Sequence, residues 1–181
     1  MLLKNDASSR VVLTVSKYVG TEYDERYGVD CYQNEKKWLT ALAGTGVTPK
    51  VIAFDDEARL IVTEYAGAPV TRTTLPANWQ TQGARILNVL RDHNCRHNDI
   101  KPREILVHNG RLCLVDFGWA SELDRPLPTT FPAELGLSFR CKEGVDDRYS
   151  FMRSIAHVLS TRAPGHHACH QRRRRRSGSI Y

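Results

Sequence analysis

The first third of the chain alternates short apolar runs with polar connections, a pattern typical of strands around one helix. Residues 11–19, VVLTVSKYV, are β-branched and apolar, which predicts a strand. Two further strands are predicted at 51–54 and 60–65. Residues 31–43 instead carry apolar side chains at helical spacing, so we expect a helix there that ends near Gly44.

Helical spacing dominates the second part of the chain. One helix is predicted at about 78–93 and a last one at 147–159, with a long irregular segment before it. Residues 105–115, ILVHNGRLCLV, predict a hairpin between these helices. The reason is that Asn109 and Gly110 both tolerate the positive φ angles of a two-residue turn.

This order of elements predicts an α+β protein with two unequal lobes. We expect a small lobe at about 1–66, a large lobe at about 67–159, and a hinge between Glu64 and Gly67. Residues 160–181 are compositionally biased and are predicted to form a disordered basic tail.

Composition favours a protein from inside a cell. None of the apolar runs approaches the roughly 20 residues of a membrane-spanning helix, and the first residues lack the apolar stretch of a secretory signal. Five scattered cysteines without a CxxC pair favour free thiols in a reducing compartment. We therefore expect an intracellular, cytoplasmic protein without a membrane span.

The net charge of +6 comes mainly from one segment, Arg172–Arg176, so the rest of the chain is close to neutral. Five consecutive arginines are typical of weak nucleic-acid contact or of a nuclear import signal. A solvated extension without a role is the plain alternative, and it remains open. Metal binding is a further alternative for four residues of the tail: His166, His167, Cys169 and His170.

Two short segments carry the chemistry: HNDIKPREILV at 97–107 and DFG at 116–118. Asp99 and Asp116 stand near opposite ends of the predicted hairpin, and a hairpin returns the chain to its start. The two carboxylates should therefore converge. Converging carboxylates bind Mg²⁺, orient a hydroxyl, or do both. Lys101 is placed to neutralise phosphate oxygens.

The pattern HxDxKPxxIL followed by DFG resembles the catalytic and metal-binding loops of the protein-kinase superfamily. The resemblance implies a two-lobed fold that uses ATP and Mg²⁺. It implies that Asp99 is the catalytic aspartate, that Lys101 steadies the transferring phosphoryl group, and that Asp116 holds Mg²⁺. His97 would pack the loop, a role that a simple core histidine would also fill.

The resemblance extends outward from these loops. In DRYSF at 147–151, Asp147 would brace the catalytic loop from below, although a helix N-cap is an equal alternative. A Lys17–Glu35 ion pair would hold the nucleotide phosphates. The alternatives are that Lys17 is a plain edge-strand lysine and that Glu35 is a solvated charge on its helix. Thr14 occupies the other strand register and could not replace the lysine. The segment from Glu64 to Ala66 would meet adenine, and FPAE at 131–134 loosely matches the APE motif.

Three departures from the family pattern stand out. The metal-binding asparagine is Glu104 here, which can ligate Mg²⁺ but adds a negative charge. No Gly-rich loop precedes the strand that carries Lys17, and the chain ends shortly after the predicted last helix, so we expect both lobes to be incomplete. Asn98 replaces an arginine that is common in kinases activated by loop phosphorylation.

The sequence therefore predicts an ATP-dependent phosphotransferase that moves the γ-phosphoryl group to a hydroxyl, with Ser or Thr of a protein as the favoured acceptor. A small-molecule or glycolipid kinase is one alternative. The other is a non-catalytic kinase-like module that binds partners, which the missing Gly-rich loop favours.

Overall fold

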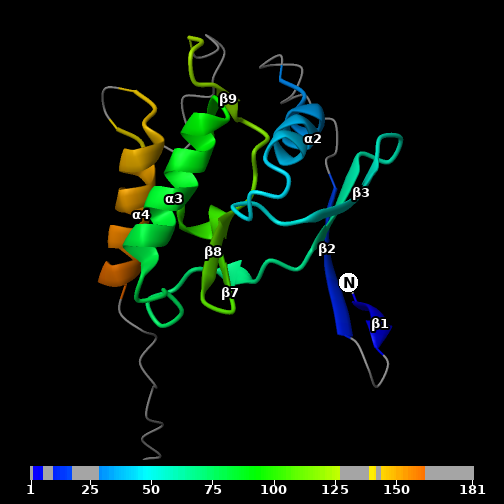
Figure 1. The fold of residues 1–181 in the computed structure, drawn as a ribbon, viewed down its shortest axis with the longest axis horizontal. Helices are drawn as coiled ribbons and strands as arrows, with labels where there is room; N and C mark the ends of the chain where they lie inside the picture. Colours follow the sequence, from blue (N-terminus) through cyan, green and yellow to red (C-terminus); the bar gives the residue numbers. More distant parts are fainter. Residues whose placement is uncertain (1, 6–9, 18–28, 127–138, 142–143, 162–181) are drawn as a thin grey trace, which may run out of the picture.

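A computed structural model describes residues 2–5, 10–17, 29–126, 139–141 and 144–161 (Figure 1). The described residues combine helices with small antiparallel sheets, so the α+β class is as predicted. FPAE, the histidine-rich segment and the arginine run all lie outside the described residues. The α-helices are α2 (Cys31–Ala41), α3 (Trp79–Asp92) and α4 (Asp147–Ser160), and η1 (Pro102–Glu104) is a 3₁₀ turn. The strands are β1 (Leu2–Asn5), β2 (Arg10–Lys17), β3 (Val51–Asp55), β4 (Leu60–Glu64), β5 (Ala68–Pro69), β6 (Cys95–Arg96), β7 (Ile105–His108), β8 (Arg111–Leu114) and β9 (Ser121–Glu122).

The largest sheet has the strand order β1-β2-β4-β3 and is antiparallel throughout. β2 pairs with β4 over five residues, from Leu13 opposite Glu64 to Lys17 opposite Leu60. β1 was not predicted, because four residues are too few to show a period of two. It is recognised only through its pairing with β2, where Leu2 lies opposite Val12.

Helix α2 begins where the sequence pattern places it. The carboxylate of Asp30 accepts a 3.0 Å hydrogen bond from the backbone N–H of Gln33 and so caps the helix. Its apolar stripe, which includes Trp38 and Leu39, is buried in the core. After the helix ends, Gly44 adopts a φ of 76°, in the left-handed region that glycine enters at little cost.

The predicted hairpin is formed by β7 and β8. Asn109 and Gly110 both have positive φ angles, 48° and 73°, as a turn of this length requires. The backbone N–H of Leu114 donates a 2.8 Å bond to the carbonyl of Val47, which ties the hairpin to the segment after α2. The hairpin is thereby held against the segment that follows α2.

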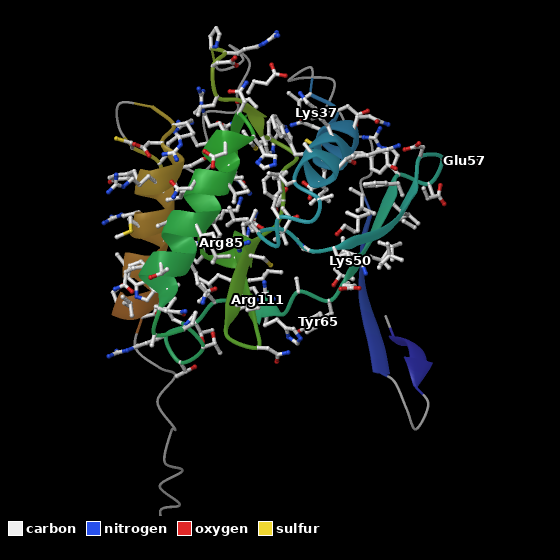
Figure 2. All side chains as sticks on the ribbon, in the orientation of Figure 1. Lys37, Lys50, Glu57, Tyr65, Arg85 and Arg111 are labelled. Atoms are coloured by element: carbon white, nitrogen blue, oxygen red, sulfur yellow. The ribbon has the colours of Figure 1, made fainter. Side chains whose placement is uncertain are left out.

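Helices α3 and α4 lie side by side on the other side of the hairpin (Figure 1). Gly83 of α3 faces the ring of Phe151 of α4 at close range. Charged side chains such as Lys50, Arg85 and Arg111 extend from the surface of the molecule (Figure 2). None of the helices formed by the described residues is long and apolar enough to span a membrane.

Candidate active site

The loop at 97–101 is built around a fully buried histidine. A ring nitrogen of His97, Nε2, lies 3.0 Å from the carbonyl of Val115, and its ring packs on Phe117 with centroids 4.5 Å apart. His97 therefore ties the HND segment to the DFG segment. This is the packing role that both interpretations of the residue predict.

A second tie comes from Asp147, at the start of α4. Its two carboxylate oxygens accept hydrogen bonds from the backbone N–H groups of His97, at 2.6 Å, and Asn98, at 2.9 Å. The N-cap of α4 is instead Asp146, which accepts from Tyr149 at 2.9 Å. Of the two roles that the sequence left open for Asp147, the contacts favour the bracing of the loop.

Asn98 has a structural reason to be an asparagine. Its φ is 71°, a conformation that asparagine tolerates better than most residues. Its side chain is buried, and Nδ2 donates to the carbonyl of Trp119 at 2.7 Å and to Ser121 Oγ at 3.0 Å. The amide therefore holds the loop against the segment that follows DFG.

Three carboxylates converge next to this loop, and the hairpin argument predicts this convergence for two of them, Asp99 and Asp116. One oxygen from each of Asp99, Glu104 and Asp116 can be chosen so that all three lie within 4.8 Å of one another. Asp99 and Glu104 are buried and Asp116 is half-buried. Three oxygens at this spacing form a suitable cage for a hard divalent cation.

Two cations flank the carboxylates and offset their charge. Lys101 Nζ forms an ion pair with Asp99 Oδ2 and lies 3.5 Å from Glu104 Oε1. Arg103, whose side chain is largely exposed, places Nε 2.6 Å from the same Glu104 oxygen. The predicted crowding of three negative groups is thus present, but it is partly compensated by neighbours that the sequence argument did not weigh.

These contacts explain the pKa of Glu104. Burial raises the pKa of its carboxyl above the ordinary value, and the nearby charge of Asp116 raises it further. The hydrogen bond from Arg103 and the charge of Lys101 lower the pKa and partly reverse the effect. The balance is a carboxyl that ionises less readily than usual but stands next to two cations.

Beside the carboxylates lies a cavity of about 410 Å³. Its walls come from β2, α2, β4 and the hairpin, and Glu104 and Asp116 line its floor. Three hydroxyl side chains also line it: Thr14, Ser16 and Thr63. A cavity of this size is within the range that holds small-molecule ligands.

Glu35 of α2 also lines this cavity and is only 5% exposed. Its Oε2 has no hydrogen-bond partner. Burial raises the pKa of Glu35 to about 8, helped by the charges of Asp116 and Glu104, while the backbone N–H groups of Phe117 and Asp116 act in the opposite direction. The structure describes no ion pair for Glu35.

The remaining site residues from the sequence analysis are less clearly placed. The side chain of Lys17 is outside the described part of the structure, although its backbone pairs with Leu60 in the sheet. Ala66 lines the cavity. Glu64 does not line the cavity, and its half-exposed carboxylate lies 3.0 Å from Lys50 Nζ.

Sequence reasoning missed several residues that shape this site. Thr14 and Ser16 line the cavity, and their spacing of two in a predicted strand was a signal for a shared face. Arg103 was passed over because it stands at a variable position of the motif. Asn34 of α2 donates Nδ2 to the carbonyls of Gly118, at 2.9 Å, and Ala120, at 2.7 Å, and no sequence pattern announces that contact.

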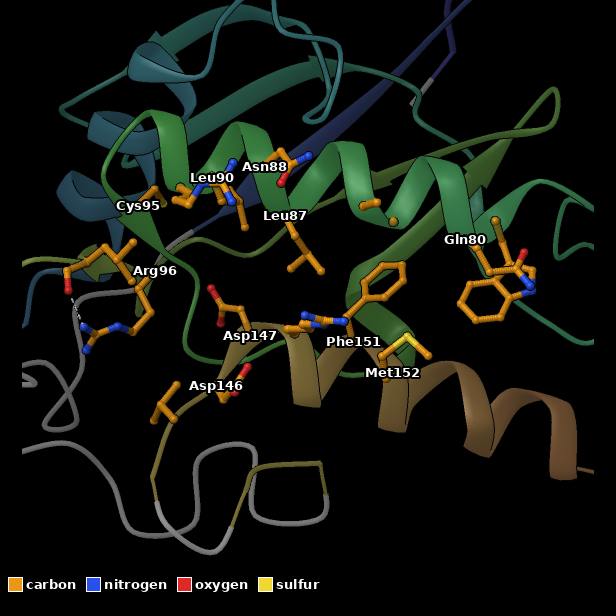
Figure 3. A pocket seen from close by; sticks show the side chains of 17 residues that line it. Gln80, Leu87, Asn88, Leu90, Cys95, Arg96, Asp146, Asp147, Phe151 and Met152 are labelled. Atoms are coloured by element: carbon orange, nitrogen blue, oxygen red, sulfur yellow. Dashed lines mark hydrogen bonds between the residues drawn. The ribbon is translucent and has the colours of Figure 1, made fainter.

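A larger cavity, of about 820 Å³, lies between α3 and α4 (Figure 3). Leu87, Phe151 and Met152 give it apolar walls, and Asp146 and Asp147 lie at one end. Asp147 already accepts hydrogen bonds from the loop at 97–98, and two of the three converging carboxylates, Glu104 and Asp116, line the smaller cavity instead. The candidate chemistry therefore belongs to the smaller cavity.

The chain matches no model of a known protein family and no curated protein.

Proposed function

We propose that this protein is an ATP- and Mg²⁺-dependent phosphotransferase of the protein-kinase type, with the hydroxyl of a protein Ser or Thr as the favoured acceptor. One observation carries the proposal: Asp99, Glu104 and Asp116 converge at the end of a hairpin, and Lys101 is paired to the first of them. This is the arrangement that phosphoryl transfer needs, because that reaction depends on positioning and on charge neutralisation.

Asp99 is suited to the acceptor hydroxyl. Lys101 occupies its Oδ2, while Oδ1 is buried and has no hydrogen-bond partner. A buried oxygen without a donor favours a ligand O–H at that position, since an unpaired buried acceptor is costly. With Lys101 held at Oδ2, the free Oδ1 is the oxygen through which Asp99 would orient the hydroxyl and take its proton.

Asp116 and Glu104 are suited to hold Mg²⁺. Both offer carboxylate oxygens within 4.8 Å of each other and of Asp99, and Mg²⁺ prefers oxygen ligands. When bound, the ion would neutralise charge on the nucleotide phosphates. The cavity that these residues line would take the nucleotide, with Ala66 at the wall where the resemblance places adenine.

Transfer of label from γ-³²P-labelled ATP to mixed protein and glycolipid acceptors tests the proposal. Asp99→Asn should lower transfer at least about 100-fold while nucleotide binding stays nearly intact, because the residue faces the acceptor. Asp116→Asn should weaken Mg²⁺-dependent nucleotide binding as well. Asp92→Asn, which changes an exposed carboxylate at the end of α3, is the matched control and should transfer at the wild-type rate.

A non-catalytic module that binds nucleotide is the second candidate. The observation that favours it is Glu35, a buried carboxyl in the cavity wall whose Oε2 has no hydrogen-bond partner among the described residues. Thermal melts distinguish the two functions. If Mg-ATP at about 5 mM raises the melting temperature but no acceptor is labelled, the binding module is correct. If neither effect is seen, both candidates fail.

A further inference from the structure

Glu35 is a buried carboxyl that the proposed reaction does not account for. Its side chain lies in the wall of the smaller cavity, 5% of the residue is exposed, and Oε2 has no donor. Burying an acid in this way is unfavourable unless it is neutral or meets a positive charge. The nearby carboxylates of Asp116 and Glu104 make its ionised form less favourable still.

The described cations near Glu35 are engaged elsewhere. Lys101 and Arg103 pair with the carboxylates of Asp99 and Glu104. The two lysines that follow Glu35 on α2 do not line the cavity and form ion pairs elsewhere, Lys36 with Asp56 and Lys37 with Glu122. Among the described side chains, none is therefore left to supply a cation to Glu35.

The strand opposite Glu35 supplies oxygen rather than nitrogen. Thr14 and Ser16 of β2 both line the cavity, as residues two apart on a strand do when they share a face. All three residues are exposed, but Val15, which stands between the other two, does not line the cavity. Hydroxyl and carboxylate oxygens together make a donor set for a hard cation, with water completing the coordination.

We propose that the smaller cavity holds a second divalent cation, bound by Glu35 and Asp116 and bordered by the hydroxyls of Thr14 and Ser16. The ion takes the position where a paired lysine would hold nucleotide phosphates. It is distinct from the ion held by Asp116 and Glu104, although Asp116 serves both. The inference deepens the proposed function, but binding of the ion does not require nucleotide or transfer.

The cavity has room for such an ion. Its volume of about 410 Å³ exceeds that of several waters, each of which occupies roughly 30 Å³ in the liquid. A hydrated divalent ion therefore fits with its remaining water ligands. Two divalent ions that share one carboxylate are a recurring arrangement in phosphoryl-transfer sites.

Titration of the full chain with Mn²⁺ alone, followed by the electron paramagnetic resonance signal of free Mn²⁺, tests this. Wild type should bind one ion more than Glu35→Gln, which keeps the size of the side chain but removes its charge. Thr14→Lys should also lose one ion, because an ammonium on the cavity face would pair with Glu35. Val15→Lys adds the same charge to the opposite face and should bind as many ions as wild type.

Equal stoichiometry in wild type, Glu35→Gln and Thr14→Lys would overturn the inference. Circular dichroism checks that each variant is folded. If Thr14→Lys is unfolded, the comparison of wild type with Glu35→Gln alone tests the second site. Failure of the inference is distinct from failure of the proposed function. If the wild type binds a single ion and transfers phosphate, and if Asp116→Asn no longer binds that ion, the proposed function stands and the second site does not exist. If the wild type binds both ions but labels no acceptor, the second site exists and the proposed function fails.

Discussion

The backbone N–H of His97 donates a 2.6 Å hydrogen bond to Oδ2 of Asp147, fifty positions later in the chain. The other carboxylate oxygen of Asp147, Oδ1, accepts a 2.9 Å hydrogen bond from the backbone N–H of Asn98. One carboxylate at the start of α4 therefore fixes the geometry of the loop that carries Asp99. Burial raises the pKa of Asp147, and these two N–H groups and the charge of His97 lower it.

Replacing Asp147 should destabilise the protein more than replacing its neighbour. Asp147→Ala leaves two part-buried N–H groups without an acceptor, which should lower the free energy of unfolding by about 2–4 kcal/mol. Asp146→Ala removes an exposed helix cap and should cost about 1 kcal/mol. Urea unfolding of the two variants measures the difference. Equal losses would mean that Asp147 does not brace the loop.

Glu35 should make the metal-free protein less stable as the pH rises. Its pKa is raised from 4.5 to about 8, so the folded state holds a proton that the unfolded state releases. The free energy of unfolding should therefore fall between about pH 4.5 and 8 and then level off. The loss is about 1.4 kcal/mol for each unit by which the two pKa values differ.

Thermal melts in EDTA over this pH range measure the effect. Glu35→Gln should flatten the decline and should be more stable than wild type at pH 8. Glu57→Gln changes an exposed carboxylate in the turn between β3 and β4, at the edge of the molecule, and should keep the wild-type profile (Figure 2). A wild-type decline that persists in Glu35→Gln would assign the pH dependence to another group.

Arg103 should weaken cation binding at the carboxylates. Its Nε lies 2.6 Å from Glu104 Oε1 and compensates the charge that a metal ion would use. Because the guanidinium is largely exposed, the effect should be small. Arg103→Gln should raise the affinity for Mn²⁺ about two- to five-fold, in line with the strength of exposed ion pairs. Arg148→Gln, an exposed arginine of α4, is the control.

Changes at Glu104 itself complete this test. Glu104→Gln keeps one oxygen ligand, so transfer should survive with a shallower dependence on Mg²⁺ concentration. Glu104→Lys should abolish binding of the ion held by Asp116 and Glu104, because it places a cation where that ion would bind. A wild-type Mg²⁺ profile in Glu104→Lys would show that Glu104 has no part in the metal site.

Gly83 should be required for the contact between α3 and α4. A Cβ at this position would lie 2.5 Å and 2.8 Å from two ring atoms of Phe151. Gly83→Ala should therefore lower the free energy of unfolding by about 1–3 kcal/mol through overpacking, although alanine favours helix. The double variant with Phe151→Leu should recover part of the loss, because the smaller side chain leaves room. Additive losses would contradict this account.

The sequence by itself determined those elements whose signals are local. Helical spacing placed α2, α3 and α4 to within a few residues, and Asn109-Gly110 placed the hairpin turn, because these patterns depend on residues a few positions apart. The convergence of Asp99 and Asp116 also followed from sequence, since a hairpin must return to its start.

Tertiary structure alone decided the features that depend on distant partners. β1 exists through its pairing with β2, and the role of Asp147 depends on a loop fifty positions away. The sequence could not tell which face of β2 borders the cavity, and the fold places Thr14 and Ser16 there. The alternation of side chains along a strand defines two faces but does not say which one borders a cavity, because that depends on elements distant in sequence that form the other walls.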